Sequence, residues 1–135
     1  MDCIFCKIAS KDIPANLIKE TEKSIAFLDT FPLTKGHSLV IPKNHHAKIQ
    51  EISDAENQDL FSLVKDVVSK VDRITGATLV AIHNGKESGQ EIPHVHVHLI
   101  PRSQNDSAGP VHNMFTERPT LNKDEINELL KSLRD

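Results

Sequence analysis

The sequence of 135 residues has no long apolar run, no excess of basic residues and no tryptophan. No stretch approaches the roughly 18 consecutive apolar residues of a membrane-spanning helix, and the first residues lack a signal-peptide pattern. The net charge of −3 argues against a broad basic surface for nucleic acid. We therefore expect a cytoplasmic protein that binds neither membranes nor nucleic acid and captures any anionic ligand locally.

Cysteine is also scarce, because the sequence contains only Cys3 and Cys6. Two cysteines cannot build a disulfide framework, and in the cytosol a C-x-x-C pair is first a candidate for metal binding or redox chemistry. No βαβ pattern surrounds the pair, which makes a thioredoxin-like role less favoured. The pair would amount to half of a zinc site, and the alternative is two unconnected thiols.

Histidine, in contrast, is concentrated in one stretch, where His94, His96 and His98 alternate with single valines. This alternation predicts a half-buried strand with the three histidines in a row on one face, closed by Pro101. Neighbouring histidines would lie roughly 6.6 Å apart, so a single ion could not bind all three. Three interpretations remain: a solvated strand face, a metal site formed by two neighbours, or a nucleophilic histidine with two supporting histidines.

The remaining pattern predicts a single α+β domain over residues 1–135, with an antiparallel sheet of about five strands. Strands are predicted at residues 17–21, 24–28, 37–41, 78–83 and along the histidine stretch. One long helix is expected over residues 53–75, where Ser53 and Glu56 form a capping box and Gly76 ends the helix. Residues 102–121 are expected to form a mobile flap, and residues 122–135 a C-terminal helix with an apolar docking stripe.

The histidine stretch resembles the signature of the histidine triad (HIT) superfamily, and further blocks in the same order extend the resemblance over about residues 3–102. The blocks are residues 3–8, 13–15, 26–29, 36–43, 84–85 and 89–90. The chain looks like a zinc-binding HIT nucleotide hydrolase of the bacterial or archaeal type. The resemblance implies a HIT-like fold, a homodimer, a structural zinc ion in each chain and a purine nucleotide substrate that contains AMP.

The resemblance also assigns roles to individual residues. The zinc ligands would be Cys3, Cys6, His45 and His94, although His46 could replace His45. His96 would be the nucleophile, His98 would hydrogen-bond the phosphate, and His94 would anchor the stretch or, without zinc, donate a proton. Asp29 would bind the ribose hydroxyls and His37 would support a triad histidine. The other nucleotide-binding positions would be Asn84, Gly89, Gln90, Glu91, Ile4, Phe5, Ile8, Phe27 and Leu39.

One departure from the family pattern concerns Glu91, where many members have serine or threonine. A carboxylate is a poor neighbour for a phosphate, so only the backbone N–H of Glu91 is expected to take part.

The predicted reaction is cleavage at the α-phosphate of an AMP-linked substrate through a covalent nucleotidyl-histidine. The sequence does not choose between phosphoramidates and dinucleoside polyphosphates. The absence of tryptophan and the length of chain after the triad fit poorly with the short phosphoramidase branch, and the flap at residues 109–115 leans toward a polyphosphate hydrolase. Two alternatives are a purine-nucleotide-binding interaction protein with vestigial activity and a zinc hydrolase whose triad holds the metal.

Overall fold

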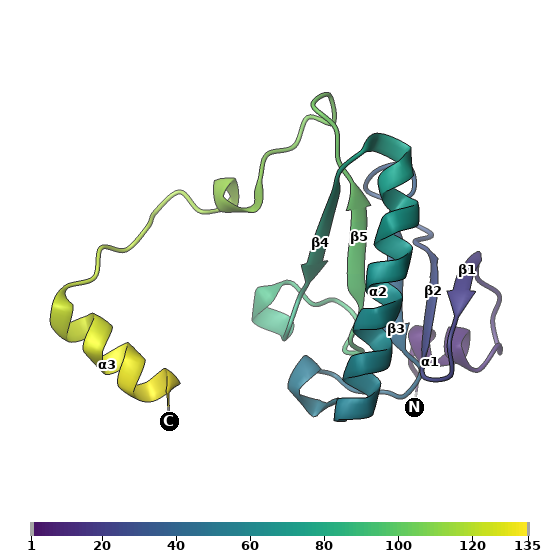
Figure 1. Cartoon of the computed structure of the whole chain (residues 1–135), viewed down its shortest axis with the longest axis horizontal. Helices are drawn as coiled ribbons and strands as arrows, with labels where there is room; N and C mark the ends of the chain where they lie inside the picture. The colour runs from purple at the N-terminus through teal and green to yellow at the C-terminus, as the bar shows by residue number, and fades with distance from the viewer. Residues whose placement is uncertain (1, 135) are drawn as a thin grey trace.

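The computed structural model describes residues 2–134 and contains one five-stranded sheet with a long helix against it (Figure 1). The elements in chain order are α1 (Ile4–Ala9), β1 (Leu17–Glu20), β2 (Ser24–Leu28), β3 (Ser38–Pro42), η1 (Ile49–Glu51), α2 (Asp54–Thr75), β4 (Thr78–Ile82), η2 (Lys86–Ser88), β5 (Val97–Pro101), η3 (Val111–Met114) and α3 (Lys123–Leu133). The predicted α+β class, the five strands, the long helix and the C-terminal helix are confirmed.

The strands are ordered β1-β2-β3-β5-β4, and every neighbouring pair is antiparallel. The connection from β3 to β4 contains α2, which crosses one face of the sheet. β5, the strand that carries His98, therefore lies between β3 and β4. In its register His98 pairs with Leu39 on β3 and with Ala81 on β4. This central position surrounds the last triad histidine with strand residues.

α2 covers one face of the sheet and forms the larger core. Its first turn is closed by Ser53 and Glu56 in a reciprocal capping box, and Gly76 ends it in the left-handed region with φ 92°. The apolar stripe of α2 packs against residues that face it from the sheet. The buried cluster comprises Ala26, Val40, Leu60, Leu63, Val64, Val67, Val71, Val95, Val97 and Leu99. Because strand side chains alternate, His98 is left on the opposite face.

The opposite face carries α1 and a smaller apolar cluster. Phe5 and Ile8 of α1 pack there with Phe27 and Leu39 of the sheet. The sequence did not predict α1. It is a six-residue helix whose N-cap is Cys3, with the Cys3 sulfur accepting a hydrogen bond from the Cys6 backbone N–H at 3.4 Å. An isolated helix this short is unstable in water, so its packing on the sheet determines it.

The predicted strand over the whole histidine stretch is wrong at its start, since β5 begins only at Val97. The Val95 backbone N–H bonds the His46 carbonyl instead of a neighbouring strand. β3 ends at Pro42, which has no N–H to donate, and the Pro42 carbonyl accepts from the His94 ring at 2.8 Å. The alternation of apolar residues toward the core nevertheless continues before β5, because Val95 belongs to the core cluster beneath α2.

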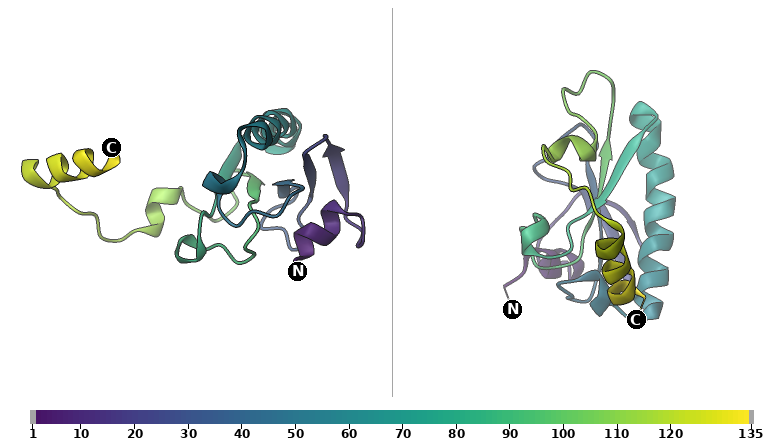
Figure 2. Two further views of the ribbon diagram at one scale, coloured as in Figure 1. Left: turned by 90° about the horizontal axis from the view of Figure 1, so that it is seen from below. Right: turned by 90° about the vertical axis from the view of Figure 1, so that its left-hand side faces the viewer.

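The C-terminal segment extends away from the sheet, and α3 lies apart from it in the views of Figures 1 and 2. The predicted cap at Asn122 and Glu125 is present. The predicted docking stripe of α3 is not docked on this chain, because Ile126, Leu129 and Leu133 are 44%, 47% and 78% exposed. Within residues 2–134, no helix is both long and apolar enough to cross a membrane.

Candidate active site and metal centre

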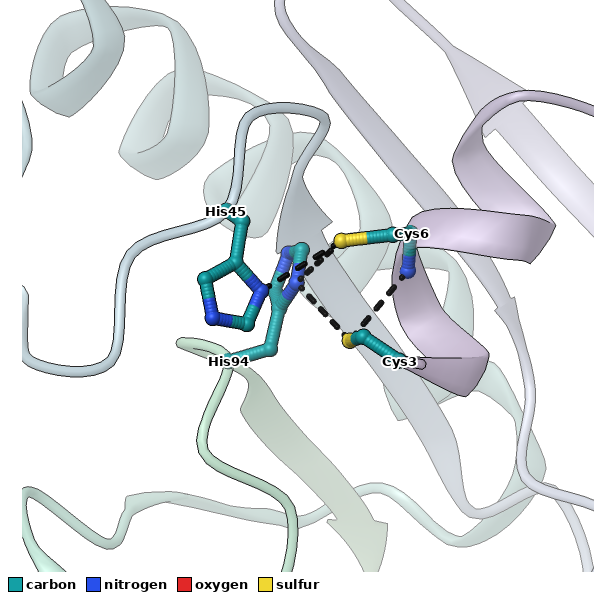
Figure 3. Close-up of side chains that lie close together, drawn as sticks. All are labelled: Cys3, Cys6, His45 and His94. Carbon is teal, nitrogen blue, oxygen red and sulfur yellow. Dashed lines mark hydrogen bonds between the residues drawn. The ribbon is translucent and has the colours of Figure 1, made fainter. Parts of the chain in front are cut away.

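Cys3, Cys6, His45 and His94 converge beside the N-terminal end of α1 (Figure 3). The Nδ1 atom of His94 lies 3.5 Å from the Cys3 sulfur and 3.6 Å from the Cys6 sulfur, and the Nδ1 atom of His45 lies 3.3 Å from the Cys6 sulfur. In tetrahedral zinc sites with Zn–S near 2.3 Å and Zn–N near 2.05 Å, sulfur and nitrogen ligands are about 3.5 Å apart. Two thiolates and two imidazoles are also a donor set that zinc favours, so the cluster fits a zinc ion.

The hydrogen bond made by the other nitrogen of the His94 ring supports this fit. Its Nε2 atom lies 2.8 Å from the Pro42 carbonyl oxygen, which can only accept a hydrogen bond. Nε2 therefore carries the proton, and the lone pair of Nδ1 is directed at the two sulfurs. Burial lowers the pKa of His94 to about 4, so the ring is neutral near pH 7, as a ligand must be.

His46 points elsewhere. Its Nε2 atom lies 3.0 Å from a carboxylate oxygen of Glu56, the residue that caps α2. Backbone N–H bonding by Ser53 is the largest cause that lowers the pKa of Glu56 to about 2, and His46 adds to the effect. Of the two neighbouring histidines, the geometry thus brings His45 to the cluster and assigns His46 to the cap of α2.

His96 is not part of the cysteine cluster. Its ring is 6% exposed and meets the Phe5 ring at a centroid distance of 5.0 Å. Its Nδ1 atom donates to the His94 carbonyl at 2.7 Å, since the carbonyl can only accept. Nε2 consequently has a free lone pair. Burial lowers the pKa of His96 from its ordinary value, which keeps that lone pair unprotonated near neutral pH.

His98 is oriented by a chain of hydrogen bonds that begins at a backbone amide. The Leu33 N–H donates to Nδ1 of His37 at 3.0 Å, so the Nε2 atom of His37 must carry its proton. That Nε2 lies 3.0 Å from Nδ1 of His98 and donates to it. The Nε2 atom of His98 is therefore an N–H donor. Burial lowers the pKa of His98 to about 4, so this donor is neutral near pH 7.

His96 and His98 line a cavity of about 360 Å³ on the face of the sheet opposite α2. One end is apolar, formed by α1 and strand residues, and the other is polar. The predicted nucleotide-binding residues in its lining are Ile4, Phe5, Ile8, Phe27, Asp29, Leu39, Gly89 and Glu91. A mostly apolar cleft with a few convergent polar groups is typical of small-molecule sites.

Asn84 and Gln90, also predicted to bind the nucleotide, do not line this cavity. The Asn84 side chain accepts from the Ile49 N–H at 2.8 Å and donates to Gln50 at 3.0 Å. The Gln90 side chain bonds the Gly85 N–H and the Ala47 carbonyl. Both amides fasten the loop between β4 and β5 to residues 47–50. They shape the loop that presents Gly89 and Glu91, and their expected contact with phosphate stays a prediction.

The triad histidines separate into two sites, which sequence spacing alone did not reveal. His94 does not line the cavity and belongs to the Cys3 cluster, where its carbonyl orients His96. Asp29, His37 and His98 form a second group of possible metal ligands, but His96 belongs to neither group. A single metal held by the whole triad therefore has no support in residues 2–134.

His83 is a lining residue that sequence reasoning missed. Its ring lies 5.4 Å from the His98 ring, and a Cβ atom on Gly89 would come within 3.2 Å of it. His83 follows β4 two residues after Ala81, the partner of His98. The period of two along a strand could have placed it beside the triad. The flap residues His112, Met114 and Phe115 do not line the cavity.

Comparison with known proteins gives a consistent result. A protein-family model described as the HIT domain matches residues 10–105. An adenosine 5'-monophosphoramidase of Schizosaccharomyces pombe is 46% identical over 102 residues, 76% of this chain and 75% of that protein. An adenylylsulfatase of Arabidopsis thaliana is 32% identical over 135 residues, 98% of this chain and 68% of that protein. The crystal structure of a HIT family member from Bacillus subtilis superposes with a TM-score of 0.85 at 30% identity and covers 99% of this chain and 96% of that one.

Proposed function

This chain belongs to the HIT family, and from that premise we propose that it is a nucleotide hydrolase or transferase that cleaves AMP-linked substrates at the α-phosphate through His96. The observation that carries the proposal is the state of the His96 ring. Its Nδ1 donates to the His94 carbonyl, its Nε2 lone pair is free, and the ring faces a cavity large enough for a nucleotide. An imidazole that donates through one nitrogen and keeps a free lone pair on the other can act as a nucleophile.

The reaction would proceed by two displacements at phosphorus. In the first, a bond forms between Nε2 of His96 and the α-phosphorus while the bond to the leaving group breaks, and the leaving group takes the electron pair. In the second, water forms the new P–O bond and loses a proton to solvent, and His96 recovers its electron pair. Dividing one difficult displacement into two lowers the barrier of each.

Charge stabilisation would come from fixed donors. The Nε2–H of His98 is held as a donor by His37 and is suited to a non-bridging phosphate oxygen. The base would occupy the apolar end of the cavity and the ribose would lie at Asp29. Among relatives, one is named for a phosphoramidate and one for an adenylyl sulfate. Compounds that join AMP to another group through a P–N bond or through a P–O bond are therefore both candidate substrates.

Intact-mass spectrometry tests this function. We expect the protein, mixed briefly with AMP phosphoramidates, diadenosine polyphosphates or adenylyl sulfate, to gain the mass of AMP minus one water molecule. Peptide mapping should assign the adduct to His96. The alternative, a purine-nucleotide-binding interaction protein with vestigial activity, predicts tight AMP binding without turnover or adduct for every substrate in the set.

The proposal includes one zinc ion in each chain, bound by Cys3, Cys6, His45 and His94. Bound there, zinc would be a structural crosslink between the N-terminal helix and the triad segment. His94 ties the two sites together, because its ring would bind the metal while its carbonyl orients His96. The zinc ion would therefore fix the position of the nucleophile without touching the substrate.

The proposal also includes a homodimer in which the C-terminal segment docks on a second copy of the chain. α3 has 11 residues, no buried side chain and an exposed apolar stripe. An isolated helix of this length is marginal in water, so it needs a surface that its own sheet does not offer. β4 is an edge strand whose Val80 is 45% exposed, which gives the second copy a further apolar contact.

Light scattering after size-exclusion chromatography is expected to give twice the chain mass of 15.1 kDa. Replacing both Leu129 and Leu133 by glutamate should weaken the dimer, because charges would enter the apolar contact. Lys131→Glu, an exposed change on the same helix, is the matched control. A monomeric wild-type protein would contradict the dimer, and an unchanged dimer in the double variant would exclude the role of α3.

Asp29 gives a further prediction, because one of its two carboxylate oxygens already accepts a hydrogen bond from the backbone. Oδ1 accepts from the Phe31 N–H at 2.8 Å, and Oδ2 lies 3.6 Å from Nε2 of His37. Asp29→Asn can retain the Phe31 bond, so it removes the second acceptor without removing the turn. We expect weaker binding of ribonucleotides by about 1–3 kcal/mol, seen mainly in KM.

The test for Asp29 is a double cycle with ribonucleotide and 2′-deoxyribonucleotide substrates on both proteins. The substitution should cost far less for the deoxyribonucleotide, which already lacks one donor. Equal losses for the two substrates would mean that Asp29 is only a turn residue.

A further inference from the structure

The cavity that holds His96 is poor in positive charge. Its lining contains the carboxylates of Asp29 and Glu91 and no lysine or arginine. Burial lowers the pKa values of His37 and His98, so these two rings are neutral near pH 7. Sites that act on polyphosphates normally neutralise them with lysine, arginine or a metal ion. Here the fixed charges of the lining are negative.

Glu91 lies where the nucleotide cavity meets a second hollow. It is exposed, and it also lines an adjoining hollow of about 510 Å³ that shares Ile4 and Ile92 with the nucleotide cavity. Within residues 2–134, it is the one charged side chain that lines both spaces. An in-line displacement places the leaving group on the side of phosphorus away from Nε2 of His96. The adjoining hollow gives that group space.

The charge of Glu91 is not neutralised within the described chain. Residues 2–134 offer it no ion pair, and the one lysine of the hollow, Lys7, is paired with Asp2 at 3.0 Å.

We propose that Glu91 is a specificity-determining residue that selects substrates by the charge of the leaving group. It favours AMP joined to an amine that carries a positive charge, accepts a neutral amine, and disfavours an anionic group such as a polyphosphate. This rests on the proposed function and deepens it, since it names the substrate class as adenylylated cationic amines. It also opposes the polyphosphate preference that the sequence suggested from residues 109–115.

The chemistry keeps the steps already described. The bond from phosphorus to Nε2 of His96 forms, the P–N bond of the phosphoramidate breaks, and the amine leaves with the electron pair and takes a proton from water. Glu91 takes no part in bond making. Its carboxylate attracts the positive end of the departing amine and repels a negative one, an effect that amounts to about three- to tenfold per unit charge at a solvent-exposed rim.

Three substrates that share the same reacting P–N bond, and differ in the charge at the far end of the amine, isolate the effect of that charge. They are AMP phosphoramidates of 1,5-diaminopentane, pentylamine and 5-aminopentanoate, whose chains end in a positive, a neutral and a negative group. We expect kcat/KM of the wild-type protein to fall in that order by about three- to tenfold per step. The order should be compressed at high ionic strength, because salt screens exposed charges.

Variants of Glu91 then test the assignment. Glu91→Gln should reduce the differences among the three substrates to within about twofold, and Glu91→Lys should reverse their order. Glu87→Gln is the matched control, since Glu87 is exposed in the same loop and lines neither space. It should keep the wild-type order.

The outcomes distinguish a failure of the role proposed for Glu91 from a failure of the proposed function. Equal kcat/KM for the three substrates in the wild-type protein, or an unchanged order in Glu91→Gln, overturns the role of Glu91 and leaves the proposed function intact. Failure of the wild-type protein to cleave any of the three rejects the role of Glu91, and it rejects the proposed function as well only if adenylyl sulfate and diadenosine polyphosphates also give no adduct on His96.

Discussion

Replacing His96 by alanine is expected to lower turnover of AMP-linked substrates by at least about a thousandfold and to remove the covalent adduct. The imidazole supplies a lone pair on Nε2 that faces the cavity, and the bond from Nδ1 to the His94 carbonyl holds the ring in this tautomer. Loss of a covalent nucleophile costs several orders of magnitude in rate because the remaining groups bind substrate without offering the two-step route.

Nucleotide binding should survive this change. The apolar end of the cavity, Asp29 and the His98 donor are all unaffected by truncating one ring. Isothermal titration with AMP, together with single-turnover kinetics, separates binding from chemistry. His112→Ala is the matched histidine control, because His112 is exposed and does not line the cavity. Turnover by His96→Ala at the wild-type rate would reject the mechanism.

Cys3→Ser is expected to remove zinc and to lower stability far more than it slows the chemistry. Cys3 is 6% exposed, caps α1 and lies 3.5 Å from Nδ1 of His94, so its thiolate would connect two segments separated by 91 positions. With free zinc at about a thousand times its dissociation constant, binding stabilises the folded state by about 4 kcal/mol. Thermal unfolding with and without a chelator measures this contribution.

The neighbouring histidines provide a matched pair for the zinc site. His45→Ala should abolish binding of the single zinc ion, whereas His46→Ala should retain it, because His46 bonds Glu56 at the start of α2. Elemental analysis of protein purified under reducing conditions gives the metal content. Protein without metal under these conditions would exclude the zinc site. Immediate loss of activity with a chelator, at unchanged stability, would favour a catalytic metal.

The sequence predicted the elements whose pattern repeats locally. The long helix follows from apolar residues at three- and four-residue steps between the Ser53 cap and Gly76, and both ends agree with the structure. The sheet follows from short runs of alternating or apolar residues. These patterns can be recognised in the sequence because the repeat of the helix or strand backbone fixes the direction of each side chain.

Elements that depend on distant partners were missed or misplaced. α1 is too short to be stable alone and forms because Phe5 and Ile8 pack on the sheet. The strand predicted from His94 starts at Val97, since Val95 bonds His46 and Pro42 lacks a donor. The bonds from the Asn84 and Gln90 amides to residues 47–50 were also not foreseen, while the predicted contact of these amides with phosphate stays a prediction. None of these partners can be read from neighbouring positions.

By itself the sequence determined the fold class, the family and the residue types available for chemistry, because periodicity, caps and ordered motifs are local properties. Roles for the triad histidines came from the family resemblance, but the contacts that set the tautomer of each ring came only from the tertiary structure. The tertiary structure places the His94 ring beside the cysteines and leaves Nε2 of His96 with a free lone pair. It also made His98 a donor through His37, 61 positions away. A histidine's tautomer is set by the hydrogen-bond partner of its other nitrogen, and only the folded chain brings that partner within reach.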